Sequence, residues 1–385
     1  MKIQLKKMGV AVAFSLGVTL SAQAVTLDLT GKSFITYGDA QTYSLNALAV
    51  QYEVEHGGTG NTINPGNPYY ITSTPGAIKD LVVLATGAGG TGVTTNVAGM
   101  DSAYATPSGV SGSTFFTTDT AVYPLGTPTP SASFTGKQVD TWDTTLSALQ
   151  GFLGTGGAPV FFFNNNQVNS GASTNQNLGV WGQATITNSS GTVIGTYDLT
   201  NRNREFALGT NPNSGGVVNG SVSAYTSAAG YNDPIDGTNA NTDYVFSGGK
   251  YCLNSLYAPV ACDGSQGPIA FGPISNNLGA DQAAYAILIP EMNAQLSSLF
   301  TGGEDLTGYA MHIDLRMGCD LSNPVTNPDC VGRSLNNGYE QVFMGSTASD
   351  YVNAPEPSSI FLIGLGLLGM GWSMHRRRGT GRLTA

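Results

Sequence analysis

Histidine, the usual general base of nucleophilic enzymes, occurs only three times in the 385 residues, as His56, His312 and His375. A serine or cysteine nucleophile needs such a base beside it, and the sequence holds neither a GxSxG elbow nor an HExxH helix. His312 shares a predicted strand face with Asp314 and Arg316. We expect this face to be solvated, with the aspartate and the arginine paired; a polar site is the alternative.

Carboxylates are more numerous than histidines, with 25 Asp and Glu residues. Two carboxylates are sufficient for glycoside hydrolysis, one as general acid and one as base or nucleophile. Because the two converge in space from distant positions, the sequence does not identify such a pair, and we assign no catalytic residue.

Oxygen ligands are densest between Asn232 and Asp243, where Asp233, Asp236 and Asp243 lie among asparagines. Calcium prefers carboxylate and amide oxygens on loops of this kind. The EF-hand spacing is absent, because Pro234 occupies its third position. The segment predicts either one calcium ion or an Asx-rich turn without metal, and no other cofactor is expected.

A stretch rich in asparagine and glutamine follows the apolar residues 161–163 and leads to Trp181. Amides beside aromatic rings are typical of sugar-binding surfaces, since rings pack against sugar faces and amides bind hydroxyl groups. The alternative is a loop whose amides satisfy the neighbouring backbone.

The four cysteines form two closely spaced pairs. In an exported chain an even number of cysteines favours disulfides. We expect the pairs Cys252–Cys262 and Cys319–Cys330, each of which closes a short loop. A zinc site is the alternative, but the sequence has no CxxC motif and few histidines.

Glycine, proline and asparagine interrupt the chain throughout, and the apolar runs between them are short. This pattern predicts a mainly β protein with an antiparallel β-sandwich-like domain, long Gly/Asn-rich loops and one or two short helices. The hydrophobic fraction of 41% is sufficient for a core. The predicted strands are Leu81–Ala85, Pro159–Phe163, Gly179–Thr187, Thr192–Leu199, Ala283–Ile289 and Tyr309–Met317.

Two segments have the spacing of an amphipathic helix. One runs from Trp142 to Leu153, and the other begins at Pro290, a residue favoured in the first helical turn. A hairpin turn is predicted at 188–191. The Pro-, Thr- and Ser-rich stretch at 124–137 marks the one candidate boundary inside the β-rich domain, which we place at 25–353.

The N-terminal segment is typical of a signal peptide. A lysine-rich start precedes an apolar run at 8–20, and Ala22 and Ala24 match the small-x-small cleavage pattern. We therefore predict a signal helix within residues 1–24 and a mature chain that begins at Val25.

The mature chain is strongly acidic. Of the 15 Lys and Arg residues, three lie in the signal peptide and four lie behind the C-terminal apolar run, so eight remain against 25 acidic residues, a net charge of −17. A charge of this sign opposes binding to nucleic acid or anionic lipid. It suits a soluble exported protein or one that meets cations.

The C-terminal segment, residues 354–380, contains an apolar run at 358–374 that would form a single transmembrane helix. The 15 residues 360–374 would span about 22 Å as a helix, against about 30 Å for a hydrocarbon core. Basic residues behind such a helix stay cytoplasmic. The flanking residues are Pro355, Glu356 and Pro357 before the run, and Arg376, Arg377 and Arg378 after it.

This order of parts resembles the PEP-CTERM sorting signal of exported proteins in Gram-negative bacteria that make exopolysaccharide. The resemblance implies that an exosortase, an integral membrane protease-transpeptidase, recognises and cuts the tail, so that the chain is held in the inner membrane only transiently. The mature protein is then expected at the cell surface or in the extracellular matrix. A GPI signal lacks the basic end, and a sortase signal needs the LPxTG motif, which is absent.

The sequence thus predicts an exported, exosortase-sorted protein without enzymatic activity, which contributes to an exopolysaccharide or biofilm matrix or to adhesion. Exosortase and exopolysaccharide are the expected partners, and nucleic acid is not. The alternative is a secreted hydrolase that acts on polysaccharide through a carboxylate pair unrecognised in the sequence.

Overall fold

The computed structural model describes most of the chain between residues 27 and 347. The residues outside the description are 1–26, 33, 38, 61–65, 79–80, 88–96, 107–114, 118–140, 167–177, 200–244, 248–249, 258, 261, 263, 265–266, 280, 319–334, 336–339 and 348–385. The predicted signal helix, the C-terminal transmembrane helix and the candidate boundary at 124–137 therefore all lie outside the described residues. Among the helices that are described, none is both long and apolar enough to cross a membrane.

The protein is mainly β, as predicted, and its larger sheet has seven strands. In spatial order they are β1 (Ile35–Tyr37), β2 (Ala40–Ser44), β14 (Tyr285–Leu288), β7 (Pro159–Asn164), β16 (Gln341–Ser346), β3 (Val82–Thr86) and β4 (Tyr104–Ala105). Neighbouring strands are antiparallel except for β3 and β4, which are parallel. The central strand β7 is buried along its whole length, which indicates that both faces of this sheet are covered.

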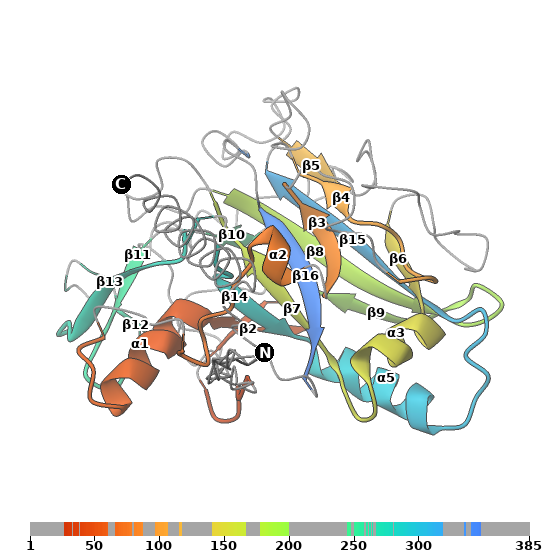
Figure 1. The fold of residues 1–385 in the computed structure, drawn as a ribbon, viewed down its shortest axis with the longest axis horizontal. Coiled ribbons are helices and arrows are strands. Elements are labelled where there is room, and N and C mark those ends of the chain that lie inside the picture. Colours follow the sequence, from red (N-terminus) through yellow and green to blue (C-terminus); the bar gives the residue numbers. More distant parts are fainter. Residues whose placement is uncertain are drawn as a thin grey trace, which may run out of the picture.

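The second sheet has six strands and is built on β8 (Leu178–Thr187) and β15 (Ala310–Gly318). These two long strands pair antiparallel, from Ala310 opposite Thr187 to Met317 opposite Val180. Figure 1 shows them running side by side through the molecule. The other strands are β6 (Trp142–Thr145) and β5 (Phe115–Thr117), which pair with β15, and β9 (Val193–Asp198) and β10 (Val245–Ser247), which pair with β8.

The turn between β8 and β9 is the predicted hairpin. Asn188 Oδ1 accepts hydrogen bonds from the backbone N–H groups of Ser190 and Thr192, at 3.0 and 2.9 Å. Gly191 has a φ of 77°, a left-handed conformation that glycine adopts without steric cost.

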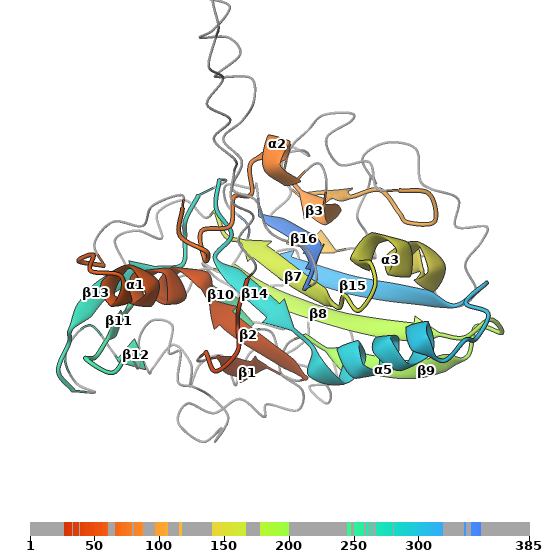
Figure 2. The ribbon, with the colours of Figure 1, turned by 60° about the horizontal axis from the view of Figure 1, so that its bottom comes forward.

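A small third sheet contains β12 (Pro259–Val260), β11 (Lys250–Leu253) and β13 (Phe271–Ser275). Cys252 and Cys262 form a disulfide here, which is the predicted pairing. The sheet is joined to the body through a short hydrogen bond of 2.5 Å between the hydroxyl groups of Tyr251 and Ser44. Figure 2 shows it beside α1 (Leu45–Glu55), at the opposite end of the molecule from α3 (Leu146–Leu153) and α5 (Pro290–Thr301).

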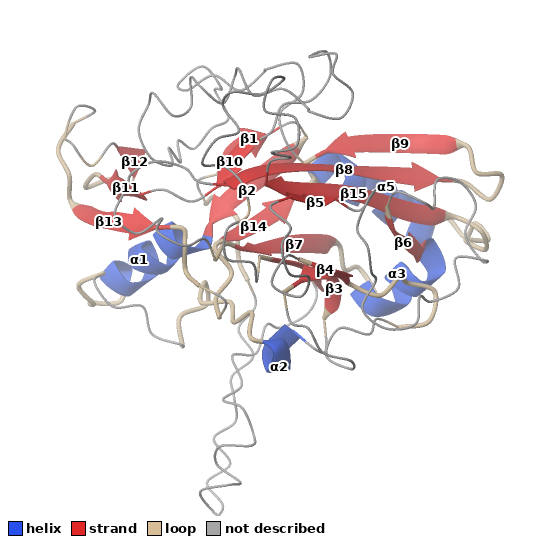
Figure 3. Cartoon of the chain, turned by 90° about the horizontal axis from the view of Figure 1, so that it is seen from above, coloured by secondary structure: helices blue, strands red, loops and turns tan. Residues whose placement is uncertain are grey.

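The main apolar core lies between the two large sheets. It combines Phe161 and Phe163 of β7 with Met311, Ile313 and Leu315 of β15. Helices α3 and α5 add side chains to the same core and lie together at one end of it in Figure 3. Their contact includes a hydrogen bond of 3.1 Å from the Gln150 side chain to the Phe300 carbonyl.

A second core covers the outer face of the seven-stranded sheet. Val160 and Phe162 of β7 belong to it, together with Leu45 and Leu48 of α1. Successive residues of β7 therefore alternate between the two cores, as the strand repeat of two requires. A short helix, α2 (Pro75–Ile78), lies on the same side through Ile78.

The helix prediction that begins at Trp142 needs correction. The segment predicted to be helical from Trp142 begins as strand β6, and the helix starts only at Leu146. Thr145 ends the strand and caps the helix, its hydroxyl accepting from the Ala148 N–H. Helix α1 was not predicted, because its first half is buried on all sides and shows no alternation between an apolar and a polar face.

Candidate functional site

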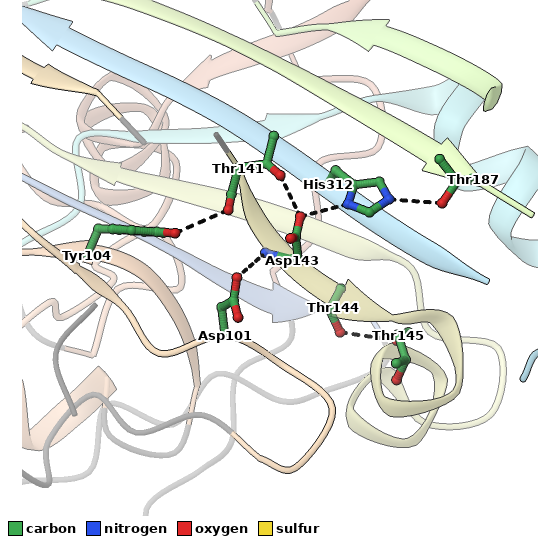
Figure 4. A network of polar contacts seen from close by, with 8 residues as sticks. All are labelled: Asp101, Tyr104, Thr141, Asp143, Thr144, Thr145, Thr187 and His312. Atoms are coloured by element: carbon green, nitrogen blue, oxygen red, sulfur yellow. Dashed lines mark hydrogen bonds and ion pairs between the residues drawn. The ribbon is translucent and has the colours of Figure 1, made fainter. Parts of the chain in front are cut away.

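Asp101 and Asp143 come together where the segment before β4 runs antiparallel to β6. The Asp101 N–H donates to the Asp143 carbonyl at 2.8 Å, and the Asp143 N–H donates to Asp101 Oδ2 at 2.9 Å. Figure 4 shows the two side chains next to one another. This local pairing places two carboxyl groups at one point although they are 42 residues apart in sequence.

Asp143 continues the network into the second sheet. Its Oδ1 accepts from the Thr141 hydroxyl at 2.6 Å and lies 2.7 Å from His312 Nδ1. The other ring nitrogen, His312 Nε2, lies 2.9 Å from the Thr187 hydroxyl. With Asp143 ionised, Nδ1 carries the hydrogen; Nε2 then accepts from the Thr187 hydroxyl if the ring is neutral and donates to it if the ring is protonated. The side chains of Asp143, His312 and Thr187 thus link β6, β15 and β8.

A carboxylate, an imidazole and a hydroxyl in this order can activate a nucleophile. Here all three groups are enclosed, because Asp143 and His312 are 0% exposed and Thr187 is 1% exposed. A nucleophile must reach the substrate carbonyl to act. In this conformation the row therefore acts as a cross-link between strands.

The surroundings of Asp101 shift its pKa. Burial raises its pKa from 3.8 to about 7, and the charge of Asp143 adds to the rise, while the hydrogen bond from the Asp143 N–H opposes it. Asp101 is 7% exposed. Two carboxyl groups with different environments, one protonated near neutral pH, form the pattern of a general acid and its partner.

A second buried polar network lies at one end of the seven-stranded sheet. Asn164, the last residue of β7, is opposite Gln341, the first residue of β16. Asn164 Nδ2 donates to the Ser73 hydroxyl at 2.7 Å, and Gln341 Nε2 donates to the Ser73 carbonyl at 2.8 Å. Gln341 Oε1 accepts from the Thr86 hydroxyl at 2.8 Å. Three strands are thus joined to the segment that precedes α2.

Glu340 and Asn165 adjoin this network, and both are 0% exposed. Burial raises the pKa of Glu340 from 4.5 to about 8, against the opposing effect of the backbone N–H groups of Glu340 and Asn166. The burial of Asn164 and Asn165 also means that these two amides do not form the exposed sugar-binding surface considered for this stretch.

The predicted strand face of His312, Asp314 and Arg316 is present, but it is buried. Arg316 donates to the Asp314 carboxylate at 2.9 and 2.7 Å, so the predicted pair forms. The expectation of a solvated face is wrong, because the three residues are at most 7% exposed. Both faces of β15 are covered, and alternation alone does not reveal this.

Most residues predicted to be functional lie outside the described residues. Within the described part of the chain, no group of three or more His, Cys, Asp or Glu side chains could hold a metal ion. The predicted functional residues that lie outside the described part of the chain are the cleavage residues Ala22, Ala24 and Val25, the calcium candidates Asp233, Asp236 and Asp243, the pair Cys319–Cys330, and the sorting residues Pro355, Glu356, Pro357, Arg376, Arg377 and Arg378.

Sequence reasoning did not identify Asp101, Asp143 or Glu340. Asp143 lay in a segment predicted to be helical, and no periodicity connects it with Asp101. The local sequence around Asp143, an aspartate directly after a tryptophan in a polar segment, does not indicate which residue the aspartate contacts.

Comparison with family models found two matches. Residues 25–316 match a family described as Domain of unknown function (DUF8239), and residues 353–378 match the PEP-CTERM protein-sorting motif. Neither the curated proteins nor the solved structures include a match to the chain. The first match covers more than half of the chain, so the protein belongs to the DUF8239 family and carries at its C-terminal end the PEP-CTERM motif that exosortase recognises.

Proposed function

We propose that the protein is a non-enzymatic component of the cell surface or extracellular matrix, where it contributes to an exopolysaccharide or biofilm matrix or to adhesion. The observation that carries this proposal is the PEP-CTERM motif at 353–378, which implies export and sorting by exosortase to the cell surface. The disulfide Cys252–Cys262 supports it, because such bonds persist in oxidising compartments. The burial of the Asp143–His312–Thr187 row supports a structural use of these side chains.

The test is whether the exported protein binds the exopolysaccharide of its own producing cells. We expect the protein to sediment with the purified polysaccharide, and deletion of its gene to reduce retention of polysaccharide at the cell surface. A variant with Pro355, Glu356 and Pro357 changed to alanine has an unaltered β-rich domain but no sorting motif. It therefore distinguishes an effect of sorting on the matrix from an effect of polysaccharide binding. Absence of binding together with an unaltered matrix would contradict the proposal.

A polysaccharide hydrolase is the second candidate, and the Asp101–Asp143 pair favours it. One carboxyl group with a pKa of about 7 beside a second carboxylate is suited to protonate a leaving group. This candidate requires an opening movement that exposes Asp143, which is 0% exposed here. Release of reducing sugar from the producer's polysaccharide, lost in Asp101→Asn and kept in the surface variant Asp305→Asn, would support it.

A further inference from the structure

Seven buried side-chain nitrogen and oxygen atoms at one end of the seven-stranded sheet have no hydrogen-bond partner within the described part of the chain. They are Thr106 Oγ1, Asn164 Oδ1, Asn165 Oδ1 and Nδ2, Gln282 Nε2, and Glu340 Oε1 and Oε2. Native proteins rarely leave buried polar atoms unpaired, and a group of them indicates an unseen water or ion. Four of these atoms belong to Asn165 and Glu340, which lie on the opposite face of the sheet from the Asn164 side chain, and they point to a species bound between these two residues.

The strand register brings Glu340 and Asn165 together. The last pair of β7 and β16 is Asn164 opposite Gln341, so one further residue on each strand places Asn165 opposite Glu340. The backbone N–H of Asn166 also lies close enough to the Glu340 carboxylate to affect its ionisation. The two side chains share the parity of Phe163 and Val342, which face the core between the two large sheets. A carboxylate and an amide thus meet at the end of this core.

The chemistry of the two side chains indicates a small cation. Both residues are 0% exposed, so a species bound between them is a small ion or water and not an organic ligand. A buried carboxyl group stays ionised only beside a compensating charge or several hydrogen bonds. Without them it takes up a proton, as the raised pKa of Glu340 indicates, and a bound cation would keep it ionised. Carboxylate and amide oxygens are the ligands of calcium, whereas zinc prefers nitrogen and sulfur.

We propose that Glu340 and Asn165 bind a calcium ion at the end of the seven-stranded sheet, with the Glu340 carboxylate as the charged ligand and Asn165 Oδ1 as a neutral ligand. Water completes the coordination, as is common for calcium. This site differs from the loop at 232–243 and does not depend on the proposed matrix function. With one charged ligand the dissociation constant is expected at about 10⁻⁴–10⁻³ M, the range of extracellular calcium modules.

The test is to purify the exported protein from its producing cells and titrate it with calcium chloride. Calorimetry measures calcium binding, and the melting temperature measures the effect of calcium on stability. At a calcium concentration about ten times the dissociation constant, the melting temperature should rise by about 2–4 °C. Glu340→Gln has nearly the same shape but no charge, so it should abolish the rise. Glu291→Gln, on the exposed start of α5, is the matched control and should keep it. An equal rise in the Glu340→Gln protein, or none in the natural protein, would overturn the proposal.

Asn165→Asp provides an independent measurement, because it adds a second carboxylate to the site. If the site coordinates calcium, this variant should bind calcium about tenfold more tightly. It should also be less stable than the natural protein without calcium, and calcium should restore its stability. If the site holds only water, the variant stays less stable at every calcium concentration, and this outcome would also overturn the proposal.

Discussion

At Asp101 a carboxyl group is buried beside the carboxylate of Asp143. Its pKa is about 7 in the folded protein, against 3.8 for an unperturbed aspartate. Between these two values the folded state keeps a proton that the unfolded state has released. Stability therefore falls as the pH rises through this window, so Asp101 opposes folding above about pH 7.

Asp101→Asn should remove this pH dependence. The amide oxygen can still accept from the Asp143 N–H, and the variant carries no charge at any pH. We expect the natural protein to lose about 1–3 kcal/mol of its free energy of unfolding, relative to the variant, between pH 4 and pH 8. Urea denaturation of both proteins across this range measures the difference.

The control for this comparison is Asp305→Asn. Asp305 is fully exposed, and hydrogen bonds from Thr307 lower its pKa. Asp305→Asn should therefore leave unchanged the fall in the free energy of unfolding above pH 4. Parallel stability curves for the natural protein and Asp101→Asn would contradict the role given to Asp101.

His312 is expected to be the most sensitive single residue of the Asp143–His312–Thr187 row. His312→Ala removes one hydrogen-bond donor from the fully buried Asp143 carboxylate, which keeps the hydrogen bond from the Thr141 hydroxyl. We expect the free energy of unfolding to fall by about 3–5 kcal/mol. His56→Ala, at an exposed histidine that caps α1 and stacks on Tyr52, should lower it by only about 1 kcal/mol. Chemical denaturation compares the two, and a similar small effect for both would show that the row adds little stability.

At the scale of elements, the third sheet depends on the disulfide more than the large sheets do. Its three strands are short, and the bond closes a loop of sequence separation 10 that runs from β11 through β12. A hydrogen bond from the Asn46 side chain to the Ser275 carbonyl, 2.7 Å long, helps to hold β13 beside α1. The body of the protein has two extensive cores of its own.

Replacing Cys252 and Cys262 by serine should therefore loosen the third sheet locally. The loss of loop closure is worth about 2–3 kcal/mol. In hydrogen exchange the amides of β11 and β13 should become less protected, while those of β7 keep their protection. Cys319→Ser/Cys330→Ser is the matched control, and we expect it to leave β11 and β13 unchanged. Uniform loss of protection across β7 and β11 would show that the disulfide supports the whole fold.

At the scale of the whole molecule, processing at both ends should change its charge. The full chain has a net charge of −10, and removal of residues 1–24 together with the basic tail leaves a chain with a net charge of −17. The mature protein should therefore be more acidic than its precursor and remain in solution after release.

Mass spectrometry of the protein recovered from cells tests this processing. We expect a species that begins at Val25 and ends near Pro355–Pro357, because the signal peptidase site and the PEP-CTERM motif define these ends. Replacing Pro355, Glu356 and Pro357 by alanine should leave the tail in place, since the exosortase signal is lost. Recovery of the natural protein only with Arg376–Arg378 attached would mean that the tail is an anchor.

Local patterns in the sequence were sufficient to predict elements that have a regular residue repeat or characteristic capping and turn residues. The strand prediction at Tyr309–Met317 agrees with β15, because alternation reports the strand repeat directly. The helix that begins at Pro290 and the turn at 188–191 were predicted for the same reason, since capping and turn residues act within a few positions. The sorting motif was also identified from the sequence, because it is a linear signal.

Only the tertiary structure decided which polar side chains are buried and which of them meet. Asp143 and His312 are 169 residues apart, and Glu340 lies far from Asn165 in the chain, so no local spacing connects them. Their contacts follow from strand order and register, which depend on packing between distant segments. The same packing buries the face of His312, Asp314 and Arg316, whose alternation alone predicts exposure to solvent.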